Sequence, residues 1–430
     1  MISKNLIFLL PILVLLLNQV YVNAVAQDYV PRNIDIERLP KNILVGSYVG
    51  GRSHLKPMLD VATILIERGH NVILLTTGNY EPSSEYPGLK QITLGPKYLT
   101  AKNRDIQEDV DYRSLARVMG LTTAAYNVNY EKFKNAAKEN NIDLFICDAF
   151  VNQPCIDVAN NLNKPVVGFT SFMQLMEPKP YKSDPVFGCN ISLENEPFFE
   201  RFRCALIQPL QIAYAYRPFT RQLNDIRDQM NIKSVSGKVS LALIDTFFGF
   251  ELPQSLAPNV QVINDPHGGA GSAHESLYTG TPMLILPFGG DQMGNAQRLE
   301  SAGIALSVDK NALDVNDDIL NKIDFLLKDE HIKKNSKRMK YLARINSNRK
   351  YRAADLIEYM LYSSGLDEYL DDGFLKEWIP AESRMGFIKA NNLDVYGVLS
   401  IIILALIGIA FKLIKYTLNP LSDRKKSKQA

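Results

Sequence analysis

The sequence predicts an α/β protein in which two domains, each built on a parallel sheet covered by helices, are followed by a membrane-spanning helix. Short apolar runs alternate with helical patterns along most of the 430 residues, which is typical of parallel strands joined by crossover helices. The clearest unit is a strand at 42–49, a Gly50–Gly51 turn, a helix that ends at Gly69, and a strand at 71–76. A charge-free apolar stretch near the C-terminus predicts the membrane span.

The composition fits a globular protein of two domains. The chain is 46% hydrophobic and 22% charged, and its net charge is +2. A nearly balanced charge gives no sign of nucleic-acid binding. The length leaves room for a sizeable core in each domain.

The N-terminal end predicts a cleaved signal peptide at 1–26. One early cation, Lys4, precedes an apolar core at 6–17 and a small-residue exit at 24–26, which is the usual order of parts in a secretory signal. An uncleaved N-terminal anchor is the alternative.

The C-terminal end predicts a transmembrane helix at 391–415 and a basic cytosolic tail at 416–430. The span is free of charge from Val395 to Phe411, and lysines and arginines follow it. Positive residues favour the cytosolic side, so we expect a single-pass type I protein with its main part in the lumen. The last five residues, KSKQA, resemble an endoplasmic-reticulum retrieval signal, although a basic stop-transfer tail explains them equally well.

The elements expected between these ends divide into an N-terminal domain at 27–250 and a C-terminal domain at 251–390. The first continues with a helix at 130–139, a strand at 143–147, a helix at 154–162, and strands at 165–169 and 239–244. The Pro- and aromatic-rich region 175–235, with helices at 198–216 and 222–230, is expected to wall an apolar pocket or to form a lid over the core. The second domain is expected to contain strands at 260–263, 283–286 and 304–308, and helices at 294–302, 315–327, 333–345 and 349–362.

One stretch, HGGAGSAHESLYTGTPMLILPFGGDQMGN at 267–295, combines features of an anion site and a hydroxyl-binding site. Its glycines allow close backbone approach, and the helix expected from Ser272 would direct N–H groups at an anion. Asp291 and Gln292 follow an apolar strand, at the edge where open α/β sheets bind ligands. Together they offer several hydrogen-bonding groups to a sugar. Ser272 and Glu275 also fit a capping box, which would only begin the helix.

Four cysteines and one sequon suit an oxidising lumen. Cys189 and Cys204 flank a polar segment and are the candidate disulfide. Cys147 lies in an apolar strand and Cys155 in the next helix, so both are expected to be buried free thiols. Asn190 begins the sequon and is a candidate glycosylation site.

These motifs resemble the membrane-bound UDP-glycosyltransferases, the family that includes the UDP-glucuronosyltransferases. The run from 267 resembles the family signature, GGRSHLKPMLDVATILIERGHNVILL its first βαβ unit, NIDLFICDAF its strand ending in an acid, and LDVYGVLS its entry to the membrane. The resemblance covers most of 40–415. It implies a GT-B-like fold of two facing Rossmann-like domains and an inverting transfer of a hexosyl group from a UDP-sugar to a hydroxyl of a lipophilic acceptor.

The resemblance also implies roles for single residues. His54 matches the general base and Asp148 the carboxylate that orients it, a pair suited to removing a hydroxyl proton. The alternative is that both are structural, His54 at a helix start and Asp148 at a strand end. The donor-site matches are His267, Gly268, Gly269, Gly271 and Ser272 for phosphate, Glu275 for ribose, and Asp291 and Gln292 for the sugar. The UDP-sugar is a co-substrate, no further cofactor or metal is expected, and His70, His274 and His331 are expected to be structural or solvent-facing.

One part of the family pattern is missing. Relatives have a segment before the His-Gly-Gly turn, with a Ser-Gly phosphate loop and a Trp-x-Pro-Gln element that reads uracil. Here only three residues separate 259–263 from His267, and the one tryptophan is Trp378. The C-terminal domain is therefore expected to be truncated and to leave apolar faces exposed.

Two hypotheses follow, and a chain with no stable fold is a third. The first is a glycosyltransferase. The second is a non-catalytic, membrane-anchored lumenal protein that binds a lipophilic ligand or pairs with an intact relative, so homo- or hetero-oligomers are possible partners.

Overall fold

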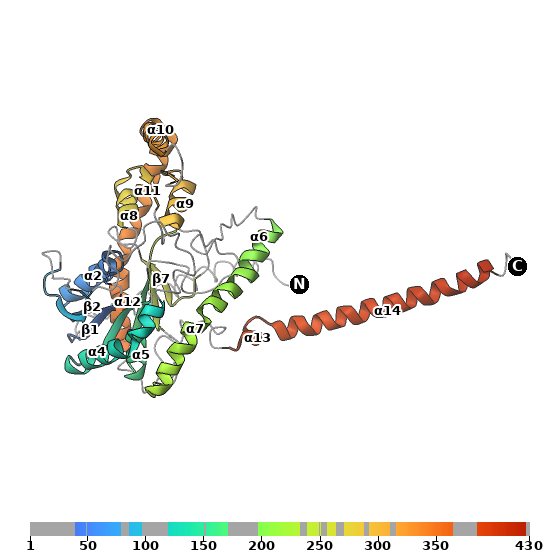
Figure 1. Cartoon of the computed structure of the whole chain (residues 1–430), viewed down its shortest axis with the longest axis horizontal. Coiled ribbons are helices and arrows are strands. Elements are labelled where there is room, and N and C mark those ends of the chain that lie inside the picture. The colour runs from blue at the N-terminus through green and yellow to red at the C-terminus, as the bar shows by residue number, and fades with distance from the viewer. Residues whose placement is uncertain are drawn as a thin grey trace, which may run out of the picture. The chain divides into compact units, whose positions relative to one another are not determined.

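The computed structural model describes residues 39–48, 50–78, 86–96, 119–149, 152–170, 197–232, 239–248, 250, 256–263, 271–287, 292–309, 315–363 and 385–426. The chain divides into two compact units, Met1–Pro40 and Lys41–Ala430. The elements below all belong to the second unit (Figure 1). The predicted signal peptide and Asn190 lie outside the described residues.

The main sheet is parallel throughout and has the order β3-β2-β1-β4-β5-β6-β7. Three of the inner strands are buried along their whole length, as expected for a sheet covered on both faces. The strands are β1 (Asn42–Ser47), β2 (Asn71–Thr77), β3 (Lys90–Gly95), β4 (Leu144–Asp148), β5 (Val166–Thr170), β6 (Leu241–Asp245) and β7 (Val260–Ile263). The sequence did not predict β3, whose residues are mostly only partly buried.

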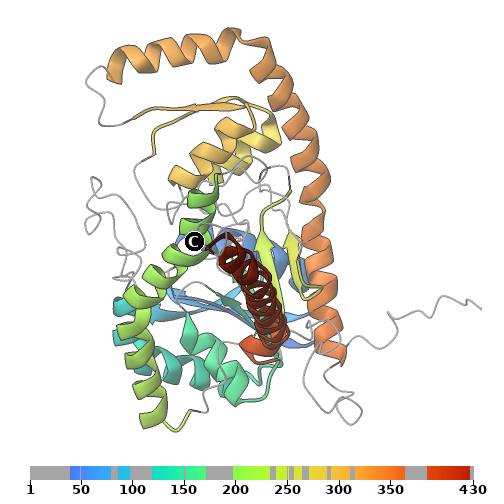
Figure 2. The ribbon, with the colours of Figure 1, turned by 90° about the vertical axis from the view of Figure 1, so that its right-hand side faces the viewer.

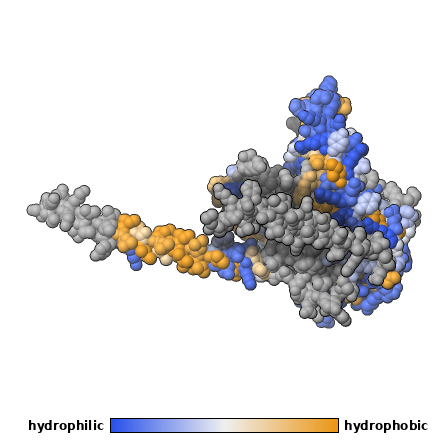
Figure 3. Space-filling view, turned by 180° about the vertical axis from the view of Figure 1, so that it is seen from behind, coloured by the Kyte–Doolittle hydropathy of each residue, from blue (hydrophilic) through white to orange (hydrophobic). Residues whose placement is uncertain are grey.

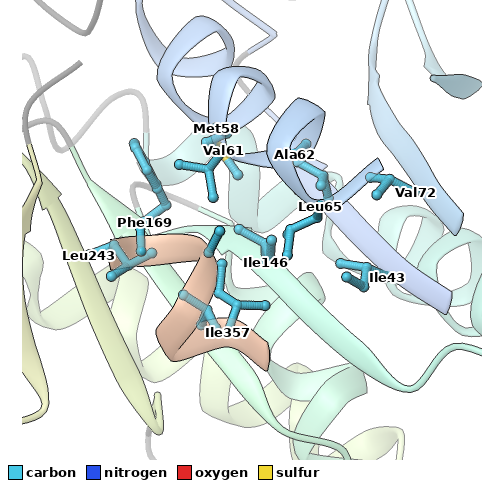
Figure 4. Packing of buried hydrophobic residues seen from close by; sticks show 14 of the residues in the cluster. Ile43, Met58, Val61, Ala62, Leu65, Val72, Ile146, Phe169, Leu243 and Ile357 are labelled. Carbon is cyan, nitrogen blue, oxygen red and sulfur yellow. The ribbon is translucent and has the colours of Figure 1, made fainter. Parts of the chain in front are cut away.

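Two layers of helices cover the sheet. One face packs against α2 (Arg52–Glu67) and α12 (Arg349–Ser363), and Figure 4 shows Leu65 of α2 and Ile357 of α12 meeting Ile146 of β4 in this core. The other face packs against α4 (Tyr126–Glu139) and α5 (Gln153–Asn161), whose buried residues join Phe145 and Leu44 of the strands. The N-terminal domain is therefore doubly wound, as predicted.

The aromatic-rich region contains one continuous helix where two were predicted. It is made of α6 (Phe198–Phe202), a π-helical turn η5 (Arg203–Ile207) and α7 (Gln208–Gln229). Pro218 lies inside α7. A proline ring is unfavourable in the interior of a helix, so the sequence pattern favours two helices here. After the proline, Leu223 and Ile226 of α7 and the C-cap residue Met230 pack on the core.

Strand β7 was expected to open the C-terminal domain, and this expectation was wrong. It pairs with β6, from Ala242 opposite Val260 to Asp245 opposite Ile263, and so extends the main sheet. An apolar run predicts a strand but carries no information about which sheet accepts it.

The second sheet, among the described residues, has two parallel strands, β8 (Met283–Ile285) and β9 (Ala305–Ser307). Four helices accompany them, α8 (Gly271–Thr279), α9 (Gln292–Ser301), α10 (Val315–Lys328) and α11 (Glu330–Ser347). A small core joins α8, α9 and α11 through Leu277, Leu299 and Met339. On α10, Leu320 and Leu327 are 65% and 68% exposed, which agrees with the expected exposed apolar faces.

Helix α12 returns the chain to the main sheet. Helix α11 packs on α8, and α12 packs on α2 and β7, so consecutive helices join the two sheets (Figure 2). The contact is ionic as well as apolar, because the buried Glu358 of α12 accepts a hydrogen bond from Arg68 at 2.6 Å and lies 3.2 Å from Nε2 of His70. His70 Nδ1 accepts from the backbone of Lys41, so Nε2 carries the proton that faces Glu358. His70 has the structural role expected for it.

A buried polar cluster fixes α7 to α5 and α4. Arg227 donates to Asp157 through Nε at 2.8 Å and Nη2 at 3.0 Å, and the hydroxyl of Tyr126 donates to the same carboxylate at 2.5 Å. All three residues are buried. Burial raises the pKa of Tyr126, and the neighbouring charge of Asp157 raises it further.

The raised pKa of Tyr126 predicts a loss of stability in alkali. The unfolded tyrosine ionises near pH 10 while the folded one stays protonated. The contribution of Tyr126 to the free energy of unfolding is therefore complete below about pH 10. It falls as the pH rises above this value, by about 1.4 kcal/mol at pH 11. Urea unfolding at about pH 9 and pH 11 should therefore show a steeper fall for the unaltered chain than for Tyr126→Phe. Equal falls would contradict this account.

Cys147 and Cys155 were expected to be free thiols, which was wrong. They form a disulfide with Cα atoms 5.9 Å apart. The turn between β4 and α5 brings the strand end beside the first turn of the helix, a proximity that a separation of eight residues did not reveal. Cys204 is also disulfide-bonded, and Cys189, the partner proposed for it, lies outside the described residues.

Gly46 of β1 packs directly against this disulfide. A Cβ added at Gly46 would lie 2.8 Å from Sγ of Cys155 and 2.6 Å from the ring of Phe133. We therefore expect Gly46→Ala to lower the free energy of unfolding by about 1–3 kcal/mol through overpacking, measured by urea denaturation. Gly386→Ala is the control, because a Cβ there meets nothing within 4 Å; equal effects of the two substitutions would refute the packing argument.

The C-terminal residues form the short helix α13 (Phe387–Ala390) and the long helix α14 (Leu393–Lys426). The part of α14 from Leu393 to Lys415 contains an 18-residue window with a mean hydropathy of 2.6, and none of that window is buried. Its apolar side chains lie along the described length of the helix (Figure 3). By length and composition this segment can cross a membrane. The helix also continues into the region predicted as a basic tail.

Candidate active site

The carboxyl ends of four neighbouring strands bring buried polar side chains to one edge of the main sheet. The last residues of β1, β4, β5 and β6 are Ser47, Asp148, Thr170 and Asp245. None of these residues is more than 1% exposed. Ligands bind at this edge in open α/β sheets, so it is the expected place for a site.

His54 and Asp148 meet at this edge. Nδ1 of His54 lies 3.1 Å from Oδ2 of Asp148, with side-chain exposures of 14% and 2%. An ionised carboxylate accepts hydrogen bonds only, so Nδ1 carries the proton and donates it to Asp148. In this tautomer Nε2 bears the lone pair, and a lone pair of this kind is what a general base uses to accept a proton. The family resemblance predicted that these two residues act as a pair, and the structure places their side chains in contact.

Ser47 and Gly50 connect the turn before His54 to Asp148. The hydroxyl of Ser47 donates to Oδ2 of Asp148 at 2.9 Å, the same oxygen that faces His54. The backbone N–H of Gly50 points at the Ser47 hydroxyl at 3.5 Å. Gly50 has φ +61°, and a Cβ there would lie 2.5 Å from the hydroxyl of Thr77, so the turn requires glycine. Helix α2 begins at Arg52, which places His54 in its first turn.

Sequence reasoning missed Ser47 and Asp245 as members of this edge. A signal was present, because the runs NILVGS, LFICD, VVGFT and LALID are each apolar and end in a polar residue. A repeated polar strand end in a parallel sheet indicates side chains gathered at one edge. Asn152 was also missed; it is fully buried, and its amide donates to the carbonyl of Gly46 at 3.0 Å.

The structure describes the expected donor side only in part. Helix α8 begins at Gly271, so Ser272 lies inside its first turn, and a capping box with Ser272 as the N-cap is not formed. Ser272 and Glu275 are exposed on α8, and Gln292 is exposed as the first residue of α9. His267, Gly268, Gly269 and Asp291 lie outside the described residues, so their expected roles remain predictions.

The remaining histidines have structural or solvent positions. His274 is buried, with its ring 5.7 Å from that of Phe250 in an edge-on contact. His331 is exposed on α11. Within the described ranges no three His, Cys, Asp or Glu side chains are placed to hold a metal ion.

Sequence comparison agrees with the motifs. The family model described as UDP-glucoronosyl and UDP-glucosyl transferase matches residues 266–428. Over these residues the chain is similar to the UDP-glycosyltransferases. The resemblance recognised in the sequence is therefore confirmed.

The curated relatives match over part of their length. A UDP-glycosyltransferase of Talaromyces amestolkiae is 37% identical over 135 residues, which are 30% of this chain and 25% of that protein. UDP-glucuronosyltransferase 1A3 of Rattus norvegicus is 24% identical over 263 residues, which are 56% of this chain and 47% of that protein. The chain thus spans about a quarter to a half of the length of these relatives.

Two solved glycosyltransferases share the fold. The glycotransferase of kitacinnamycin superposes with a TM-score of 0.51 at 18% identity, over 75% of this chain and 99% of that one. Spinosyn rhamnosyltransferase SpnG superposes with a TM-score of 0.51 at 12% identity, over 74% and 99%. At these identities the likeness shows the fold alone, and it confirms the α/β, GT-B-like architecture predicted from the sequence.

Proposed function

We propose that the chain transfers a hexosyl group from a UDP-sugar to a hydroxyl of a lipophilic acceptor, with His54 as the general base. The contact of His54 with Asp148 at the carboxyl edge of the main sheet carries this proposal. A carboxylate that fixes the tautomer of a histidine and stabilises its protonated form is the arrangement that general-base catalysis requires. The family match supports glycosyl transfer as the reaction.

The chemistry is a single displacement. The acceptor hydroxyl gives its proton to Nε2 of His54 while its oxygen attacks the anomeric carbon of the donor. The bond between that carbon and the UDP oxygen breaks, and UDP leaves with the electron pair. Asp148 stabilises the imidazolium that forms. One displacement inverts the anomeric centre.

On the donor side, the N-terminus of α8 would receive the diphosphate. A helix N-terminus offers N–H donors and a positive dipole to an anion, and Gly271 and Ser272 lie at this end of α8. Glu275 would accept from ribose hydroxyls, and Gln292 would read the sugar together with Asp291. The donor is the expected partner; no resident cofactor takes part in these steps.

The apolar helix supports a membrane location. We infer that Leu393–Lys415 anchors the chain as a single span, with the two sheets in the lumen and the basic tail in the cytosol. The basic residues after the span favour this orientation. A lipophilic acceptor that partitions into the membrane would then reach the site at high local concentration.

A second candidate function is that of a non-catalytic, membrane-anchored protein. It is favoured by the small second sheet, which has two strands among the described residues, and by a sequence with no counterpart to the uracil-reading element. Such a chain would bind a lipophilic ligand or associate with an intact relative without turnover.

A transfer assay on the full chain in phospholipid vesicles separates the two candidates. The donors are UDP-glucose and UDP-glucuronate, the acceptor is a lipophilic phenol, and the products are the glycoside and UDP. We expect both products in equal amounts. Absence of the glycoside together with no saturable binding of either UDP-sugar by calorimetry would overturn the transferase proposal.

A further inference from the structure

We propose that the Cys147–Cys155 disulfide is a positioning element for the His54–Asp148 pair. The inference deepens the proposed function, since it assigns a further set of residues to the same site. It rests on where the bridge lies in the fold, beside the residues that hold the carboxylate of Asp148.

The bridge begins one residue before Asp148. Cys147 is the fourth residue of β4 and Asp148 is the last, so any shift of the Cys147 backbone is passed directly to the carboxylate. Cys155 lies in the first turn of α5, and both cysteines are fully buried. The disulfide therefore joins the strand end that carries Asp148 to the start of the following helix.

Hydrogen bonds fix the segment that the disulfide closes. The N–H of Ala149 donates to the carbonyl of Phe169 on β5 at 2.7 Å, and the N–H of Cys155 donates to the carbonyl of Asn152 at 3.2 Å. The amide of Asn152 donates to the carbonyl of Gly46 on β1 at 3.0 Å. The loop after Asp148 is thus attached to both neighbouring strands.

The Sγ atom of Cys155 also lies beside β1, the strand that ends at Ser47. Gly46, the residue whose missing Cβ leaves space for Sγ of Cys155, directly precedes Ser47. Ser47 donates to the oxygen of Asp148 that faces His54. The disulfide therefore packs against both strand ends whose side chains meet at Asp148, at the point where Gly46 of β1 pairs with Cys147 of β4.

This placement distinguishes positioning from ordinary stabilisation. A disulfide elsewhere would raise the free energy of unfolding and leave the pair unchanged. Loss of this bridge removes the covalent link that holds the end of β4, and with it Asp148, to the start of α5. A misplacement of about 1 Å at a catalytic group can cost about 10²-fold in rate. Reduction by a dithiol has the same consequence, since it breaks the S–S bond, adds two electrons and two protons, and leaves two thiols while the reductant becomes a disulfide.

The test compares Cys147→Ala/Cys155→Ala with the unaltered chain, both in vesicles. The first readout is the low-field N–H proton of the His54 ring in chain labelled with ¹⁵N-histidine, assigned by its loss in Asp148→Asn. We expect the double variant to lose this resonance or to exchange it with water at least about tenfold faster. The second readout is transfer, for which we expect kcat to fall about 10–100-fold and KM for the UDP-sugar to stay unchanged.

A matched control removes the other bridge. Cys189→Ser/Cys204→Ser should keep both the resonance and kcat, because Cys204 lies on the π-helical turn η5. If the double alanine variant loses its near-ultraviolet circular dichroism, Cys155→Ala alone, which retains a thiol at 147, takes its place. An unchanged resonance and unchanged kcat in a folded variant would overturn the proposal. If the unaltered chain shows no transfer, the proposed function fails, while the resonance still decides the positioning.

Discussion

Replacing His54 by alanine is expected to lower kcat/KM for transfer by about 10²–10⁴-fold, the usual contribution of a general base. The dissociation constant of the UDP-sugar should stay unchanged, because His54 faces Asp148 on the main sheet and the expected donor contacts lie on α8 and α9. Initial rates at saturating donor measure kcat/KM for the acceptor, and calorimetry with the UDP-sugar measures its dissociation constant.

The control for this substitution is His331→Ala. His331 is exposed on α11 and has the same side chain, so its removal should change neither rate nor affinity. Turnover retained in His54→Ala would refute the assignment of the base. A loss of UDP binding together with turnover would instead show that His54 belongs to the donor site.

The second large effect is expected at the buried pair of Asp157 and Arg227. Removing the carboxylate in Asp157→Ala leaves the guanidinium buried without its bidentate partner, and such a change costs about 3–5 kcal/mol. The hydroxyl of Tyr126 loses its acceptor as well. We expect the urea midpoint to fall accordingly with an unchanged slope.

An exposed ion pair provides the matched control. Asp324 lies 2.7 Å from Lys328 on α10, with side chains 61% and 75% exposed, so Asp324→Ala should cost less than about 1 kcal/mol. The double variant Asp157→Ala/Arg227→Met should recover part of the lost stability, since it removes the buried guanidinium charge that Asp157→Ala leaves without its carboxylate. Equal costs for Asp157→Ala and Asp324→Ala would contradict the burial argument.

Much of the main sheet could be predicted from the sequence. The strands predicted at 143–147 and 165–169 lie within one residue of β4 and β5, because a strand buried on both faces is a continuous apolar run between polar turns. The turn before His54 could be predicted from Gly50, whose φ of +61° favours glycine. The helix that follows could be predicted from its apolar residues at helical spacing. The pairing of His54 with Asp148 needed the family resemblance, because their separation of 94 positions leaves no local signal.

What the sequence missed depends on long-range contacts. The sheet that accepts β7 is decided by its pairing with β6 and its contact with α12. The disulfide of Cys147 depends on the direction in which α5 leaves β4, which no spacing rule encodes. Strand β3 was missed because its edge position leaves most of its residues partly exposed and weakens the apolar pattern.

The anomeric configuration of the glycoside formed by the full chain tests the central claim most directly. The donor is an α-linked UDP-sugar, and the configuration of the glycoside is read from its anomeric coupling by proton NMR. A single displacement with His54 as base predicts a β-linked product. An α-linked product would require two displacements or a different course of reaction, and it would contradict the role given to the His54–Asp148 pair.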